Sequence, residues 1–132
     1  MSSAADDFRI ILDGNSSVGL TFGTDMFVGA MPDMPDECIS IIDTGGQEPD
    51  RGPYEKATVQ VMVRAGVGEY IAGYELAKAV QGALHEYYGE PDSGSLYYAG
   101  VWTTGEPFYL GTDTRGRPLF SLNFRYQGGN KR

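Results

Sequence analysis

One short motif in this sequence has residue types suited to acid–base catalysis. Asp43-Thr44-Gly45 directly follows the apolar run 38–42, so the aspartate would stand at the end of a buried strand. Two such carboxylates, brought together from two copies of a chain, can share one proton. This chemistry would require the motif on a turn at an interface between the copies.

The same motif also has a structural interpretation. Asp43 or Thr44 can begin a turn in which Gly45 and Gly46 supply positive φ angles. The enzymatic alternative, a retroviral-type aspartic protease, would have a nearly all-β chain and a second apolar-apolar-glycine signature before a short C-terminal helix. Here a long helical pattern lies in the middle of the chain. We therefore expect a structural turn at residues 43–46 and no enzymatic activity.

Other reactive residues are few. Cys38 is the only cysteine and His85 the only histidine, which excludes an internal disulfide and any cysteine- or histidine-rich metal site. Cys38 lies within an apolar run and is expected in the core, and His85 is expected on the solvated side of a helix. Gly66 and Gly68 lack the third glycine of a dinucleotide-binding motif. We expect neither a cofactor nor a metal.

The charge of the chain is negative and unevenly distributed. Its 132 residues, expected to form a single soluble domain, carry a net charge of −8. Eleven of the eighteen acidic residues precede residue 56, and none follows Asp113. This distribution would suit head-to-tail contacts between copies of the chain. It also disfavours tight binding to nucleic acid or anionic membranes, while allowing DNA to pass without sticking.

The first residues of the chain and the lengths of its apolar runs indicate the cellular compartment in which it folds. No secretion signal is recognisable in the first residues, and no apolar run reaches the length of a transmembrane helix. We therefore expect no membrane association and folding in a reducing cytoplasm.

The periodicity of the sequence predicts an α+β fold. A short helix is expected at residues 4–13, capped by Ser3, and a long amphipathic helix at about 69–88. Strands are expected at 38–42, 56–65, 95–103, 106–111 and 119–127, and they would form a mostly antiparallel sheet covered by the long helix. Residues 14–36 are loop-like with one ragged strand, 31–36 form a stiff, extended acidic connector, and 128–132 form a flexible tail.

Several segments occur in an order and spacing shared with one known family. They are the apolar strand ending at 43–46, Tyr54, the strand 59–64, and then Tyr70, residues 74–77 and residues 83–84. Residues 105–111 and 117–125 look like closing strands of the same family. On these segments the sequence resembles the tail terminator or minor capsid proteins of long-tailed bacteriophages. Residues 1–36 match only loosely.

This resemblance implies a structural virion protein at the neck of the phage. The family assembles as a ring, commonly a hexamer, which caps the head-proximal end of the tail tube and ends tube polymerisation. The implied partners are copies of the chain itself, the tail tube protein and the head-tail connector or stopper protein. DNA would pass through the lumen without specific binding. Another neck, head-closure or tail-completion component is the nearest alternative.

Partner contacts are expected where loops project from the ends of strands. The candidate residues lie in the loop 47–53, in the turn 112–118 and in the final strand: Glu48, Asp50, Arg51, Arg115, Arg117 and Arg125. The three later arginines would pair with acidic residues of a neighbouring copy, such as Glu48 and Asp50.

Overall fold

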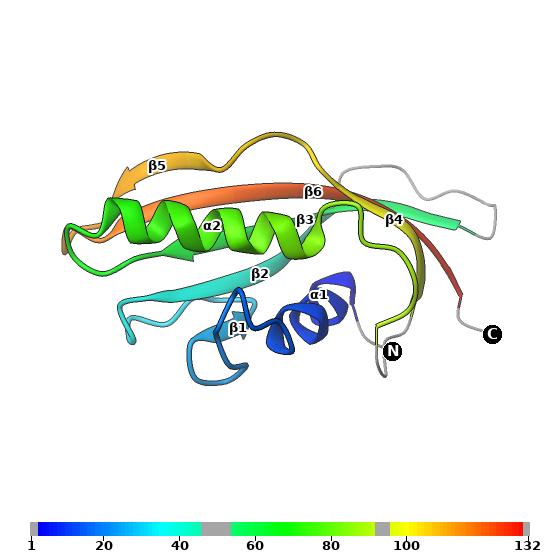
Figure 1. Ribbon diagram of the computed structural model, residues 1–132, viewed down its shortest axis with the longest axis horizontal. Coiled ribbons are helices and arrows are strands. Elements are labelled where there is room, and N and C mark those ends of the chain that lie inside the picture. The colour runs from blue at the N-terminus through cyan, green and yellow to red at the C-terminus, as the bar shows by residue number, and fades with distance from the viewer. Residues whose placement is uncertain (1–2, 46–53, 92–95, 131–132) are drawn as a thin grey trace.

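A computed structural model describes residues 3–45, 54–91 and 96–130 of the chain (Figure 1). Two helices and six strands follow one another along the sequence, in the order α1 (Ala4–Asp13), β1 (Met26–Val28), β2 (Cys38–Gly45), β3 (Tyr54–Arg64), α2 (Tyr70–Leu84), β4 (Leu96–Thr103), β5 (Phe108–Thr112) and β6 (Pro118–Asn130). The predicted α+β class, with two helices and a mostly antiparallel sheet, is confirmed.

The sheet is organised around the long strand β6. Strand order is β1-β2-β3-β6-β4, and β5 pairs with the part of β6 that β4 leaves free. One edge of β6 therefore pairs with β3 along its length, whereas the other edge pairs first with β5 and then with β4. Only β1 and β2 run parallel. This arrangement puts β5 and β4 toward opposite ends of the long axis of the molecule (Figure 1).

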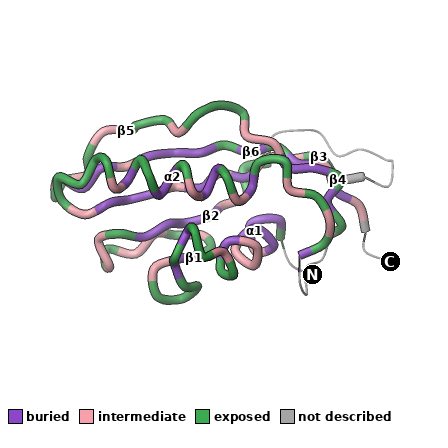
Figure 2. The backbone as a smooth tube through the Cα atoms, viewed as in Figure 1, coloured by how far each residue is buried: buried purple, intermediate pink, exposed green. Residues whose placement is uncertain are grey.

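Both helices pack on one face of this sheet. Val59, Val61 and Val63 of β3 alternate onto that face and are fully buried, and the strand lies where the sequence predicts one. The fully or nearly fully buried side chains of β6 that meet them are Phe120, Leu122, Phe124 and Tyr126. Figure 2 shows the sheet strands largely buried behind α2 and the outer surface of α2 exposed.

The N-terminal helix forms where the sequence predicts it. Ser3 caps α1, because its hydroxyl accepts a hydrogen bond from the Asp6 N–H at 3.2 Å. Phe8 and Leu12 are fully buried and attach the helix to the sheet. Asp7 also lies in the first turn of α1, but it does not face solvent. Its side chain is buried and accepts a hydrogen bond from the Tyr98 hydroxyl at 2.7 Å.

Several predicted boundaries need correction. Helix α2 ends at Leu84 rather than near residue 88, because His85 is extended and Glu86 has a positive φ of 66°. Residues 86–89 instead lie along β4, with backbone hydrogen bonds to Val101 and Tyr98. Strand β6 runs to Asn130, so residues 128–130 are not a flexible tail but pair with β3 and β4.

The acidic connector at residues 31–36 is curved rather than extended. Four of its backbone carbonyls, those of Pro32, Asp33, Pro35 and Asp36, accept hydrogen bonds from the buried guanidinium of Arg64. Because these carbonyls converge on one side chain, the segment folds over the end of β3. It covers this end of the sheet on the side opposite the helices.

Gly73 sets the distance between α2 and the sheet. A Cβ built at this position would lie 2.7 Å from Phe120 Cε1 and 2.9 Å from Ala65 Cβ. We expect Gly73→Ala to lower the free energy of unfolding by about 1–3 kcal/mol, because the overpacking outweighs the better helix propensity of alanine.

Gly82 in the same helix provides a matched control. A Cβ there would meet nothing within 4 Å. Gly82→Ala should therefore stabilise the protein, by up to about 1 kcal/mol. Urea denaturation of both variants measures the difference, and equal effects at the two positions would contradict the proposed role of Gly73.

Candidate interaction surfaces

Asp43, the candidate catalytic residue, acts as a helix cap. Its Oδ1 accepts a hydrogen bond from the Ala5 N–H at 3.0 Å, next to the cap that Ser3 provides. The motif is not a turn as predicted, because β2 continues through Asp43 and Thr44 to Gly45, with an irregularity in pairing between Asp43 and Gly45. Gly45 does have the positive φ that the sequence predicted, at 75°. Gly46 lies outside the described residues.

The capping contact gives different expectations for two substitutions of Asp43. Asp43→Ala should lower stability by about 1 kcal/mol, because the first turn of α1 loses an acceptor. Asp43→Asn should cost much less, because its amide oxygen can accept the same hydrogen bond. Thermal unfolding compares the two variants. A protease would lose all function in Asp43→Asn, so normal assembly of that variant would exclude the enzymatic alternative.

The remaining candidate reactive groups are in structural positions. Cys38 is fully buried, as predicted, and burial raises the pKa of its thiol. His85 is exposed but lies just after α2, where its Nδ1 accepts a hydrogen bond from the Thr103 N–H at 3.1 Å. No group of three or more metal-ligating side chains occurs in the described ranges. Among the same residues, no helix is long and apolar enough to cross a membrane.

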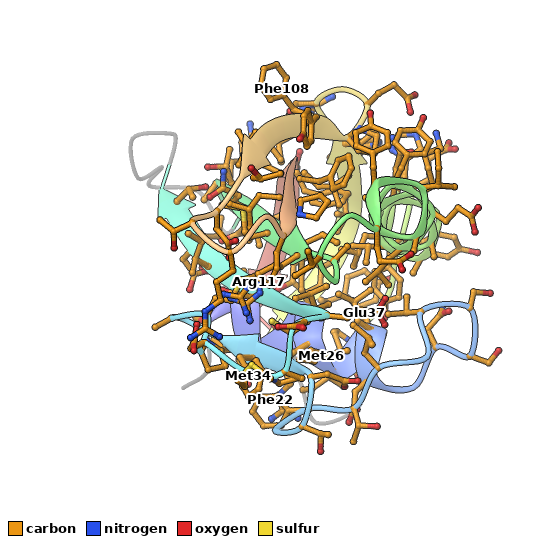
Figure 3. The ribbon with its side chains drawn as sticks, turned by 90° about the vertical axis from the view of Figure 1, so that its left-hand side faces the viewer. Phe22, Met26, Met34, Glu37, Phe108 and Arg117 are labelled. Carbon is orange, nitrogen blue, oxygen red and sulfur yellow. The ribbon has the colours of Figure 1, made fainter. Side chains whose placement is uncertain are left out.

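Arg117, a predicted partner contact, is bound within its own chain. Its guanidinium forms ion pairs with Asp113 at 2.7 Å, Asp36 at 3.0 Å and Asp33 at 3.1 Å, and its side chain is only 4% exposed. The N–H of Arg117 also donates to Asp113, which lowers the pKa of that carboxyl. Figure 3 shows Arg117 on the side of the sheet away from α2. Some of the unevenly distributed charges are thus paired within one chain.

The other predicted contact residues differ in their surroundings. Arg115 is exposed and pairs with Asp33 at 2.9 Å. Arg125 is exposed, and its guanidinium lies over the ring of Trp102 at 4.7 Å. Glu48, Asp50 and Arg51 lie outside the described residues. The structure therefore leaves Arg125 as the predicted arginine that has no ion-pair partner among the residues it describes.

An exposed apolar surface, which we call the aromatic edge, lies at the end of the molecule that carries β5. It consists of Val67, Tyr70, Ile71, Tyr74, Phe108, Tyr109 and Leu110, each at least 37% exposed. Tyr70 and Tyr109 join the helix part to the strand part, with ring centroids 5.0 Å apart, and both contact Phe120 beneath. Phe108 projects outward from this end (Figure 3). Phe108 pairs with Ser121 and Tyr109 with Phe120, so this surface extends around both sides of the strand edge. Several large apolar side chains exposed at one end of the molecule mark a contact with a partner.

The backbone of β5 adds to this surface. Residues 86–89 cover the outer edge of β4, and Gly23 donates to the Met26 carbonyl at the outer edge of β1. In the described part of the chain, β5 pairs only with β6 and nothing pairs with its outer edge. Proteins usually cover or blunt exposed strand edges. An uncovered edge beside exposed aromatic side chains is suited to docking.

A second surface lies on the face of the sheet that the helices do not cover, near β4. A shallow pocket of about 220 Å³ is lined here by Lys56, Ala57, Thr58, Trp102, Arg125, Tyr126 and Gln127. Lys56 and Arg125 are exposed, and neither forms an ion pair within the described residues. Glu55 points to the other face, where it accepts a hydrogen bond from the Tyr126 hydroxyl at 3.1 Å. We call this surface the cationic pocket.

Parts of these surfaces could be predicted from the sequence. Arg125 was a candidate, whereas Lys56, Trp102 and the aromatic edge were not. Except for Val67, the residues of the aromatic edge belong to the predicted helix 69–88 and the predicted strand 106–111, and none of them was predicted to have a contact role. The available signal was the segment 108–110. Its three successive large apolar side chains do not alternate with polar ones, and this pattern indicates exposure on a strand edge.

Two comparisons with known proteins found similar proteins. The sequence profile of the bacteriophage tail terminator protein family matches residues 15–128. Among solved structures, a chain from the virion of a native gene transfer agent particle has a similar fold, with a TM-score of 0.72 and 15% identity over 98% of this chain and 100% of that chain. A search of curated proteins found no match.

Proposed function

The chain belongs to the bacteriophage tail terminator protein family, and we propose that it forms a ring that caps the head-proximal end of the phage tail tube. The observation that carries this proposal is the family match over residues 15–128, which includes β1 to β5, α2 and most of β6 but not α1. As a member of this family it is a structural, tail-related component of the virion, and its role is assembly rather than catalysis.

The ring is proposed to contain six copies and to end tube polymerisation at the correct length. Its two sides would contact the tail tube protein and the head-tail connector or stopper protein. The two surfaces described above support a ring of copies, because a head-to-tail ring needs two different surfaces on every subunit. Assembly would take place in the host cytoplasm, and the finished ring would lie in the neck of the virion.

DNA would pass through the lumen of this ring without specific binding. A net charge of −8 supports free passage, since phosphates gain little by approaching a surface that is mainly anionic. The buried cluster around Arg117 adds to this effect, because its positive charge is already matched by three carboxylates.

Deletion of the gene in the phage that carries it tests the proposed function. Electron microscopy is expected to show tails of uncontrolled, excessive length that are not joined to heads. Expression of the chain from a plasmid should restore normal tails. DNA-filled heads without tails would instead assign the protein to the head side of the neck, and normal virions would exclude a role in assembly.

A further inference from the structure

We propose that the aromatic edge of one copy docks against the cationic pocket of a second copy, and that this contact holds copies together without other virion components. The inference rests on the proposed ring, and it specifies which surfaces form it. A ring requires only that each copy has two complementary surfaces. We assign the contact to these two surfaces because of their positions and their charges.

The positions of the two surfaces suit a head-to-tail contact. The aromatic edge lies with β5 and the N-terminal half of α2 at one end of the long axis (Figure 1). The cationic pocket lies near β4, toward the other end, on the face that carries neither α1 nor α2. Two different surfaces at opposite ends give a heterologous contact, which can repeat from copy to copy and close into a ring.

The charges at the aromatic edge are the complement of those in the pocket. Glu69, which directly precedes α2, and Glu75, in the N-terminal half of α2, are both exposed near Tyr70 and Ile71. Neither glutamate has an ion-pair partner in the portion of the chain that the structure describes. At the other end, Lys56 and Arg125 form no ion pair with any residue that the structure describes, although the chain carries almost twice as many acidic as basic residues. Docking would match these two sets of charges.

The same charges disfavour the simplest alternative contact. The uncovered edge of β5 could pair with β5 of a second copy, which would give a two-fold symmetric dimer. That arrangement would bring Glu69 and Glu75 of both copies toward each other, and like charges oppose such a contact. Trp102 further favours the head-to-tail contact, because it offers a half-buried aromatic surface beside Arg125 for the apolar side chains of the edge.

Charge reversal tests this contact on the full chain. Sedimentation velocity over a range of concentrations is expected to show that the wild-type chain associates. Arg125→Glu should weaken association by about tenfold or more, because the reversed charge would face Glu69 and Glu75. The double variant Glu75→Lys/Arg125→Glu should recover most of the wild-type association, since the pair is then restored with exchanged signs.

A second double variant separates pairing from net charge. Glu37→Lys/Arg125→Glu has the same net charge, but Glu37 is an exposed residue that belongs to neither surface. This variant should remain as weak as Arg125→Glu alone. Equal recovery in both double variants, unchanged association of Arg125→Glu, or a wild-type chain that stays monomeric at every concentration would overturn the proposed contact.

Failure of the contact and failure of the proposed function give different results. If Arg125→Glu assembles into virions with normal tails, the contact is wrong and the terminator function stands. If the charge exchange restores association but gene deletion leaves tails normal, the contact stands and the function is wrong.

Discussion

Replacing Phe8 with alanine should lower the free energy of unfolding by about 3–5 kcal/mol, as is usual for truncating a buried aromatic side chain. Phe8 is fully buried, and its ring contacts Tyr98, Phe124 and Tyr126 at centroid distances of 6.0 to 6.2 Å. It is the main link between α1 and the sheet. A loss of this size is a large share of the stability of a typical domain, about 5–15 kcal/mol.

The physical reason is that α1 cannot form by itself. A helix of ten residues is marginal in water, so its stability comes from docking onto the sheet. When the docking weakens, the hydrogen bonds that the Ala5 and Asp6 N–H groups donate to Asp43 and Ser3 also contribute less to stability. Circular dichroism during urea unfolding measures the total loss, and amide hydrogen exchange should show faster exchange in α1 than in β3.

Phe22→Ala is the matched control for this prediction. Phe22 is 41% exposed, and its main described contact is the guanidinium of Arg9 at 4.3 Å from the ring centroid. Its truncation should cost no more than about 1 kcal/mol. Similar losses for the two phenylalanines would contradict the assignment of Phe8 as the anchor of α1.

The elements with strong local patterns could be predicted from the sequence. Strand β3 alternates valines with polar residues, and α1 has a capping serine followed by an apolar face, so both appear where the periodicity places them. The end of α2 could not be predicted in this way. Residues 85–88 continue the helical pattern of the sequence. In the fold, however, the backbone of this segment pairs with β4, and the periodicity of a helix does not encode a pairing with a later strand.

The roles of charged residues were the least predictable part. Asp7 and Arg117 look like surface residues in the sequence, yet both are buried, and apart from Asp113 the partners described for them come from distant parts of the chain. Tyr98 meets Asp7 across 91 positions, and Asp33 meets Arg117 across 84. No local pattern encodes such pairs. Arg125 was a candidate contact from its position in the sequence alone. Its role in the cationic pocket depends on Trp102 and Lys56, and only the pairing of the strands brings these two residues beside it.

Arg64 holds the curved segment 31–36 in place, and its replacement is the second substitution expected to have a large effect on stability. Its side chain is buried, its Nε donates to the Asp36 carbonyl at 2.9 Å, and one amino group lies 2.7 to 3.1 Å from the carbonyls of Pro32, Asp33 and Pro35. Hydrogen bonds to a charged group contribute about 1.5–3 kcal/mol each and are not additive. We therefore expect Arg64→Ala to cost about 2–4 kcal/mol in equilibrium urea unfolding.

Two further substitutions separate hydrogen bonding from packing at Arg64. Arg64→Met keeps an apolar stem but no donor, so it should cost nearly as much as Arg64→Ala if the carbonyl contacts dominate. Arg115→Met removes the exposed ion pair to Asp33 at the same segment and should cost less than about 1 kcal/mol. A methionine variant as stable as the wild type would show instead that the stem of Arg64, rather than its guanidinium, secures this end of the sheet.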